Sequence, residues 1–219
     1  PDVWQQALPG LSALVSDTLV VAGLSSAAAL VLVIACLEAE DARGRTQSRA
    51  LSALIFAPLL LPQIGFLFGV QVLWSLLRLD GGVFAVSWTH LLFVLPYVFL
   101  ALSHPFRALD PRLARTARSL GASRLTTLLR IKLPLLARPV LIALAIGFAV
   151  SIGLYLPTVF AGAGRVETLA TEAVAMASGG DRRQSGVVAF TQTLLPFVAL
   201  SLALCIPAIM ARNRQGLKA

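Results

Sequence analysis

Residues 117–134 read ARSLGASRLTTLLRIKLP, a basic stretch that lies between two strongly apolar blocks. Upstream of it, Asp110-Pro111 is typical of a helix start, with Asp as the N-cap and Pro at the first helical position. Gly121 is typical of a helix end, where a residue in the left-handed conformation stops the helix. Ser123 can then cap a second short helix, which we expect to end at Pro134. The stretch therefore predicts a helix, a glycine turn and a second helix.

The chain as a whole carries too little charge for a water-facing surface. Of its 219 residues, 58% are hydrophobic and 13% are charged, whereas a soluble domain has about 25% charged residues. The mean hydropathy is +0.85. Apolar blocks close to the roughly 20 residues that cross a bilayer cover residues 18–37, 51–77, 83–103, 139–160 and 187–211. We therefore expect an all-α membrane protein with about five transmembrane helices.

Two details of these blocks carry further expectations. The block 51–77 contains Pro58 and Pro62, which predict one kinked or tilted helix rather than a straight one. The block 139–160 contains glycines and a proline that permit close packing and bending. Both cysteines lie inside apolar blocks and are expected to fill space rather than form a disulfide or a metal site.

The distribution of Lys and Arg predicts the orientation. The connections between blocks and the two chain ends fall alternately on the two sides of the membrane. Those on one side hold 14 of these residues, and those on the other side hold 4. The positive-inside rule then places the loop 104–138 and the C-terminus in the cytoplasm and the N-terminus outside. The net charge of +8 follows from this topology, so we expect no nucleic-acid partner.

Periodicity alone leaves two uses open for the basic helical pair. It could lie as amphipathic helices on anionic lipid headgroups. It could also dock into a groove on a soluble partner.

The spacing of particular residues resembles a known signature. The pattern E-A-A-x3-G-x9-I-x-L-P marks the inner-membrane permease subunits of binding-protein-dependent ABC importers, and it is similar here at Ala117, Gly121, Ala122, Ser123, Ile131, Leu133 and Pro134. The sequence departs from the pattern at Arg115 and Thr116, where the family has Glu and the first Ala. Since that Glu helps to seat the loop in the ATPase, Arg115 implies a partner with a complementary acid or a degenerate loop. The resemblance favours docking to a protein over docking to lipid.

The resemblance implies a function and an assembly. Residues 1–219 would form a single permease domain of the type I importer core, one half of a larger or paired permease, in the bacterial inner membrane. Residues 104–138 would be the cytoplasmic coupling loop. The partners would be ABC ATPase subunits, a second permease half or copy, and an extracytoplasmic solute-binding protein. ATP and Mg would be bound by the ATPase, with no cofactor and no catalytic residue in this chain. Residues 157–183 look most like permeases for thiamine and ferric iron, so a thiamine-like solute is expected.

Candidate site residues fall into three groups. The ATPase-coupling residues are Arg115, Ala117, Gly121, Ala122, Ser123, Ile131, Leu133 and Pro134. Intramembrane polar groups are functional candidates by default, and those expected to line the translocation path are Gln63, Ser151, Tyr155 and Thr158. The outer loop before the last block is expected to contain a short helix starting after Thr168 and to contact the binding protein through Glu172, Arg182 and Arg183. His90 is expected to be a packing histidine, and no metal site is predicted.

The sequence also bears on other classes of function. An intramembrane enzyme would need, for example, a serine nucleophile with a histidine partner or paired aspartates. No aspartate lies inside an apolar block, and the block 187–211 offers Ser151 no histidine partner. The chain also has no G-x4-G-K-[ST] phosphate loop, so ATP hydrolysis belongs to a separate subunit. An ion channel or a secondary transporter, with the loop on lipid, is the alternative.

Overall fold

The computed structural model describes residues 2–44, 49–179 and 182–212, and the regular elements in these ranges are all helices. Three helices are long and apolar enough to cross a membrane: α1 (Asp2–Arg43), α4 (Val83–Arg107) and α11 (Arg182–Arg212). Two bent helix pairs raise the number of candidate spans to as many as 5 if each pair counts as one. The prediction of an all-α membrane protein is therefore confirmed.

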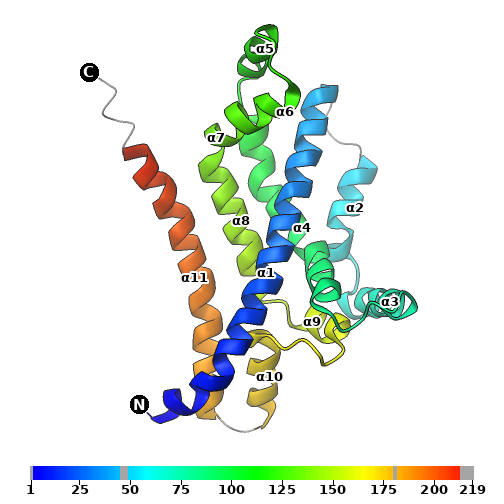
Figure 1. The fold of residues 1–219 in the computed structure, drawn as a ribbon. Helices are drawn as coiled ribbons and strands as arrows, with labels where there is room; N and C mark the ends of the chain where they lie inside the picture. Colours follow the sequence, from blue (N-terminus) through cyan, green and yellow to red (C-terminus); the bar gives the residue numbers. More distant parts are fainter. Residues whose placement is uncertain (1, 45–48, 180–181, 213–219) are drawn as a thin grey trace.

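The core lies where α1, α4 and α8 (Ala137–Ile152) pack against one another (Figure 1). It is filled by Val33 and Leu37 of α1 and by Val94, Val98 and Leu102 of α4, together with the smaller Ala143 of α8. Gly147 of α8 lies at the closest crossing. A Cβ built there would come 2.7 Å from Cγ2 of Val98 and 3.3 Å from Cβ of Ser26. The three helices approach so closely because this position has no side chain.

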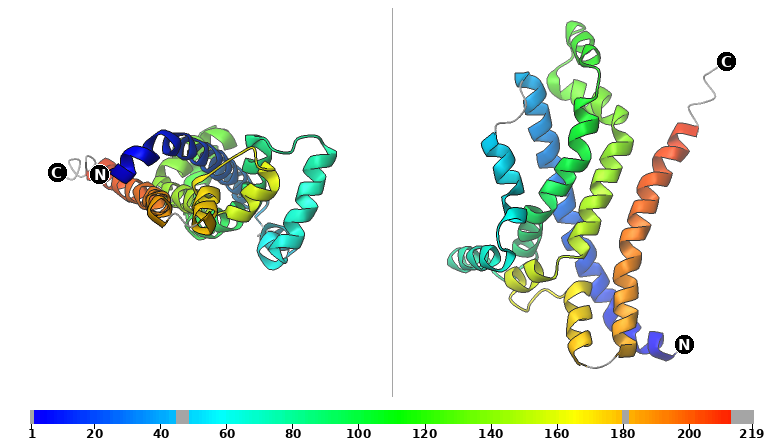
Figure 2. Two further views of the ribbon diagram at one scale, coloured as in Figure 1. Left: turned by 90° about the horizontal axis from the view of Figure 1, so that it is seen from below. Right: turned by 180° about the vertical axis from the view of Figure 1, so that it is seen from behind.

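The block 51–77 does not form the single kinked helix expected from its prolines. It is divided into α2 (Arg49–Leu60) and α3 (Gln63–Leu76), which meet at an angle of 105°. The division falls at Pro62, which has no N–H to continue the helical hydrogen bonds and whose ψ of 114° is extended. Figure 2 shows α3 lying crosswise beside the bundle rather than along it.

The block 139–160 is also divided, at Gly153. The helix α8 ends at Ile152, and a separate helix α9 (Tyr155–Gly162) follows. The carbonyl of Ile152, released by the end of the helix, accepts a hydrogen bond of 3.4 Å from the side-chain amide of Gln192 on α11. A neighbouring helix thus satisfies a backbone group that the break exposes, as an apolar environment requires.

The outer loop folds into α10 (Leu169–Gly179), which begins directly after Thr168 as expected. The capping differs in detail from the expectation. The Thr168 hydroxyl is buried with no hydrogen-bond partner, and the Thr168 N–H instead donates to the hydroxyl of Thr171 at 2.8 Å. The Leu169 N–H donates to the Thr18 hydroxyl of α1 at 2.9 Å, which joins the outer helix to the bundle.

The helix α5 (Pro111–Ser119) stands beyond the ends of α1 and α4 at one end of the molecule, and α6 (Arg124–Thr127) lies at about the level of the end of α1 (Figure 1). The start of α1 and the helix α10 lie at the opposite end, and α11 runs from beside α10 towards the end that carries α5. The loop 104–138 and the end of the last span therefore share one side of the bundle, as the charge pattern predicts.

Candidate functional site

The segment 110–136 projects from the bundle, and we call it the knuckle. Its first helix, α5, begins as expected: the backbone N–H of Arg112 donates to the Asp110 carboxylate at 2.8 Å, and Pro111 occupies the first turn. The side chain of Asp110 thereby satisfies one of the N–H groups that a helix start leaves without a partner.

The turn after α5 requires glycine-like backbone geometry. Gly121 has φ of +87°, in the left-handed region. Its N–H donates to the carbonyl of Arg118 at 3.0 Å, and the N–H of Ala122 donates to the carbonyl of Ala117 at 3.0 Å. These two bonds form a Schellman motif. Ser123 then caps α6 by accepting from the N–H of Thr126 at 3.1 Å. The predicted order of helix, glycine turn and helix is confirmed.

The end of the second helix differs from the prediction, because Pro134 does not terminate it. A π-helical turn η1 (Leu128–Lys132) follows α6, and the short helix α7 (Leu133–Leu135) contains the proline. In a regular helix, Pro134 would lack its N–H and clash with the carbonyl four residues earlier. The wider turn, closed by a bond from the N–H of Leu133 to the carbonyl of Leu128, accommodates it. The chain bends by 82° only at the junction with α8.

The knuckle carries exposed leucines at its turn and a buried alanine on its inner side. Leu120 and Leu125 flank the glycine turn and are 84% and 64% exposed. On the inner side, Ala117 is 8% exposed. The predicted coupling residues are divided between the two: Arg115, Gly121, Ser123 and Pro134 are exposed, Ala122, Ile131 and Leu133 are half-buried, and Ala117 is buried. The buried ones shape the knuckle, and the exposed ones are accessible to a partner.

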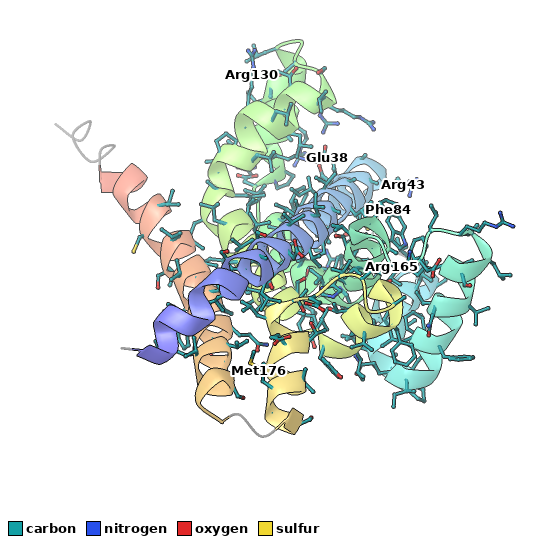
Figure 3. All side chains as sticks on the ribbon, turned by 60° about the horizontal axis from the view of Figure 1, so that its bottom comes forward. Glu38, Arg43, Phe84, Arg130, Arg165 and Met176 are labelled. Carbon is teal, nitrogen blue, oxygen red and sulfur yellow. The ribbon has the colours of Figure 1, made fainter. Side chains whose placement is uncertain are left out.

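An ion-pair cluster joins the knuckle to the spans, and we call it the clamp: Lys132 with Glu38 and Asp41. Lys132 is buried, and its Nζ lies 2.5 Å from Oε2 of Glu38 and 2.8 Å from Oδ2 of Asp41, both on α1. The ammonium group also lies 5.4 Å from the ring centre of Phe106 on α4, within the range of a cation–π contact. Figure 3 shows Glu38 at the end of α1 that faces the knuckle.

Sequence reasoning missed the clamp, because it counted Lys132 only as one of the cytoplasmic positive charges. The acids offered a signal. Glu38, Glu40 and Asp41 stand together at the end of a span whose flank is otherwise basic, and residues three apart share a helix face. Glu40 pairs separately, with Arg107 at the end of α4, at a distance of 3.0 Å.

A second buried polar cluster lies among the spans around His90 of α4. Its Nδ1 is 2.8 Å from the Ser151 hydroxyl of α8, and its Nε2 is 2.9 Å from the Thr158 hydroxyl of α9. Thr158 donates its own hydrogen to the carbonyl of Leu154 at 2.8 Å, so it accepts from Nε2–H. Nδ1 is then left to accept from Ser151, which in turn accepts from Ser25 of α1 at 3.0 Å. One directed chain of hydrogen bonds thus connects α1, α8, α4 and α9.

The four residues expected to line the translocation path do not lie together: two belong to the His90 network and two do not. Ser151 and Thr158 are buried, and each is hydrogen-bonded to a different ring nitrogen of His90. Gln63, the exposed first residue of α3, and Tyr155, the half-buried first residue of α9, lie outside this network. Sequence reasoning identified the hydroxyls and the histidine individually but not their connection.

The outer end carries the residues expected to meet a binding protein. Glu172 lies half-buried in the first turn of α10. Arg182 and Arg183 open α11, and their side chains lie outside the described residues. Nearby, Arg165 pairs with Asp80 at 3.1 Å, which joins the α9–α10 connection to the α3–α4 connection. In the parts of the chain that the structure describes, no group of three His, Cys, Asp or Glu could hold a metal ion.

The segments of the chain that match known proteins are much longer than the knuckle. The family model described as "binding-protein-dependent transport system inner membrane component" matches residues 20–218. The inner membrane ABC transporter permease protein YnjC of Escherichia coli K12 is 42% identical over 164 residues, which cover 75% of this chain and 32% of YnjC. The spermidine/putrescine transport system permease protein PotC of the same strain is 33% identical over 100 residues, covering 46% of this chain and 36% of PotC. The matched segments thus cover about a third of each relative's length.

Proposed function

This chain belongs to the inner-membrane components of binding-protein-dependent transport systems, and we propose that its knuckle is the site where the ATPase docks. As an ABC transporter permease it is a multi-pass inner-membrane protein without catalytic activity of its own. In this family ATP is generally bound by a separate ATPase subunit. The system also involves a binding protein and a partner permease.

The observation that carries the proposal is the exposed apolar tip of the knuckle. Leu120 and Leu125 lie on either side of a turn fixed by the Schellman bonds. The turn follows α5, the helix that stands beyond the end of α1 (Figure 1). An amphipathic helix on lipid lies flat at the level of the headgroups with its apolar face turned to the bilayer. Here α5 stands farther out than α1, and the exposed leucines at the turn that follows it can be covered by a soluble subunit.

Co-purification of the ATPase subunit of the same transport system tests this proposal. Replacing Leu120 and Leu125 together by Ser removes apolar contact area without adding charge, so we expect at least a tenfold loss of retained ATPase. The matched control replaces Leu60 and Leu76, which are 78% and 77% exposed but lie on α2 and α3. ATPase retention should be unchanged in the control. Equal retention by both double variants would contradict the proposal.

Arg115, which stands where the family has Glu, provides a second test at the same surface. It is exposed, and its Nε donates a long hydrogen bond of 3.4 Å to the carbonyl of Pro111. We propose that it faces an acidic group of the ATPase. Arg115→Glu should then weaken ATPase retention more than Arg112→Glu, which makes the same charge change on the same helix. Stronger ATPase retention by Arg115→Glu than by the natural chain would instead show that the ATPase carries the group that the family's Glu normally contacts.

The remaining assignments are proposals of the same kind. We propose that residues 1–219 act as one half of a permease, and that Tyr155 and Gln63 face the path between the halves. Ser151 and Thr158 would reach the path only when the His90 network opens. Glu172, Arg182 and Arg183 are proposed to contact the binding protein. Replacing both arginines by Glu should lower the affinity of the isolated binding protein for the reconstituted complex.

For the solute, we propose a small organic cation. The thiamine-like expectation from residues 157–183 and the polyamines in the name of PotC share this chemistry, and an aromatic ring such as that of Tyr155 can bind a cation. Competition in vesicles containing the complete transporter tests it: thiamine or spermidine should inhibit uptake of the labelled solute. Inhibition only by anionic or neutral solutes would contradict it.

A further inference from the structure

The clamp lies at the point where the knuckle joins the spans. A cavity of about 300 Å³ separates α5 from the ends of α1 and α4, and Leu37, Phe106 and Leu113 contribute to its lining. The first helix of the knuckle is therefore not packed directly onto the spans at this place. The second half of the knuckle, η1, is the part that the clamp attaches to them.

Lys132 contacts both neighbouring spans at once. It pairs with two carboxylates of α1 and lies over the ring of Phe106 on α4. Its side chain is 8% exposed and that of Glu38 is 21% exposed, so their attraction is screened less than in a surface ion pair. Asp41 is 45% exposed, so its attraction to Lys132 is screened more strongly. Lys132 is also the last residue of the π-helical turn, which adds one residue before Pro134 and so changes the direction in which the side chains point.

The other end of α8 is also attached to α1. Ser151 accepts a hydrogen bond from Ser25 at 3.0 Å. One turn earlier on α8, Gly147 lets α8 approach α1 closely. The clamp lies on η1, before the 82° bend into α8, and Ser151 lies near the far end of α8, so α1 is attached both to the knuckle and to α8. A displacement of the knuckle that preserves the clamp must therefore move α1 as well as α8.

We infer that Lys132 is a positioning residue that makes the knuckle and α1 move as one body when the ATPase closes. This inference rests on the proposed ATPase docking at the knuckle. Without the clamp, the knuckle would tilt over the cavity, and less of its movement would reach α1 and the outer end.

Distance measurements between two spin labels test this inference, with labels at Arg112 on α5 and at Leu24, 53% exposed on α1. The background replaces Cys36 by Ala and Cys205 by Ser, and the complex carries an ATPase variant that binds ATP without hydrolysing it. In the otherwise natural chain we expect one narrow distance distribution, unchanged by ATP. In Lys132→Met the distribution should broaden or shift when ATP binds, and Lys132→Arg should restore the narrow distribution.

Arg107→Met is the matched control, because Arg107 also pairs with α1, through Glu40, but lies on α4 before the knuckle. It should lower thermal stability yet keep the distance unchanged by ATP. If Lys132→Met does not fold, the exchange of Glu38→Lys with Lys132→Glu restores an ion pair and should restore the narrow distribution. An ATP-independent, narrow distribution in a folded Lys132→Met complex overturns the inference. Failure of the natural chain to retain the ATPase would instead overturn the proposed docking.

Discussion

At the scale of single residues, His90 illustrates how one side chain can organise several helices. It is 1% exposed and bonds to hydroxyls on α8 and α9. Each hydroxyl has another partner, Ser25 for Ser151 and the carbonyl of Leu154 for Thr158. Removal of the imidazole would therefore leave the buried Ser151 O–H without its acceptor, whereas Thr158 would keep its bond to the carbonyl of Leu154.

We predict that His90→Phe destabilises the protein by about 1–3 kcal/mol, the usual range for the loss of buried hydrogen bonds. Thermal unfolding of the purified protein in detergent measures the change. The other histidine provides the control: His104 is exposed at the end of α4, so His104→Phe should leave the unfolding temperature nearly unchanged. Equal shifts for the two variants would show that the network contributes nothing to stability.

Local sequence rules were accurate at single residues wherever the geometry depends on near neighbours. The capping by Asp110 and Ser123 and the left-handed turn at Gly121 were all predicted from residue type and spacing. The link from Lys132 to Glu38 could not be found in that way, since 94 positions separate the two residues and only the packing of α1 against the knuckle brings them together.

At the scale of helices, the crossing at Gly147 controls how closely α8 approaches its neighbours. A Cβ at this position would lie 2.7 Å from Val98 and 3.0 Å from Val94, both on α4. These valines are fully buried and have little room to move, so a methyl group must push the helices apart.

We predict that Gly147→Ala lowers stability by about 1–3 kcal/mol, as overpacking of a close-packed core does. Gly69→Ala in α3 is the control, because a Cβ there would meet nothing within 4 Å, and alanine favours a helix over glycine. Thermal unfolding should therefore show a lower midpoint for Gly147→Ala and an equal or higher midpoint for Gly69→Ala. A stabilising Gly147→Ala would mean that the three helices are not in direct contact.

The positions of the helices were predicted better than their continuity. Every apolar block became helical, but Pro62 and Gly153 each divided a block that had been expected to form one helix. A proline or glycine can bend a helix or end it, and the outcome depends on neighbours that satisfy the released backbone groups. Gln192 does this for Ile152 from a helix far along the chain. The π-helical turn at Pro134 was missed for a related reason: the sequence shows the proline but not the wider turn that accommodates it.

At the scale of the whole molecule, the two ends of the bundle differ in charge and in shape. The knuckle with its arginines lies at one end, and α10 lies at the other (Figure 1). The 14 to 4 distribution of Lys and Arg predicts that the knuckle lies in the cytoplasm, and this orientation can be measured without knowledge of the solute.

We predict that Ser178→Cys on α10 reacts with a membrane-impermeant maleimide in intact spheroplasts, whereas Arg130→Cys on the knuckle reacts only after permeabilisation. Both positions are exposed, and Cys36 and Cys205 are replaced in both variants. The same labelling of permeabilised samples verifies that each thiol is reactive. The reverse pattern would invert the topology and remove the knuckle from the reach of any ATPase.

The ion pairs between α1 and later residues also set an order of events during synthesis. Glu38, Glu40 and Asp41 leave the ribosome long before Arg107 and Lys132, their partners in the folded chain. Most of the core can likewise form only after the later helices have been made, because α1 packs against α4 and α8. The first span must therefore remain near the insertion machinery, loosely held, until residue 132 has been translated. Rare codons or pauses before that point would extend the time during which α1 lacks these partners and is exposed to quality-control proteases.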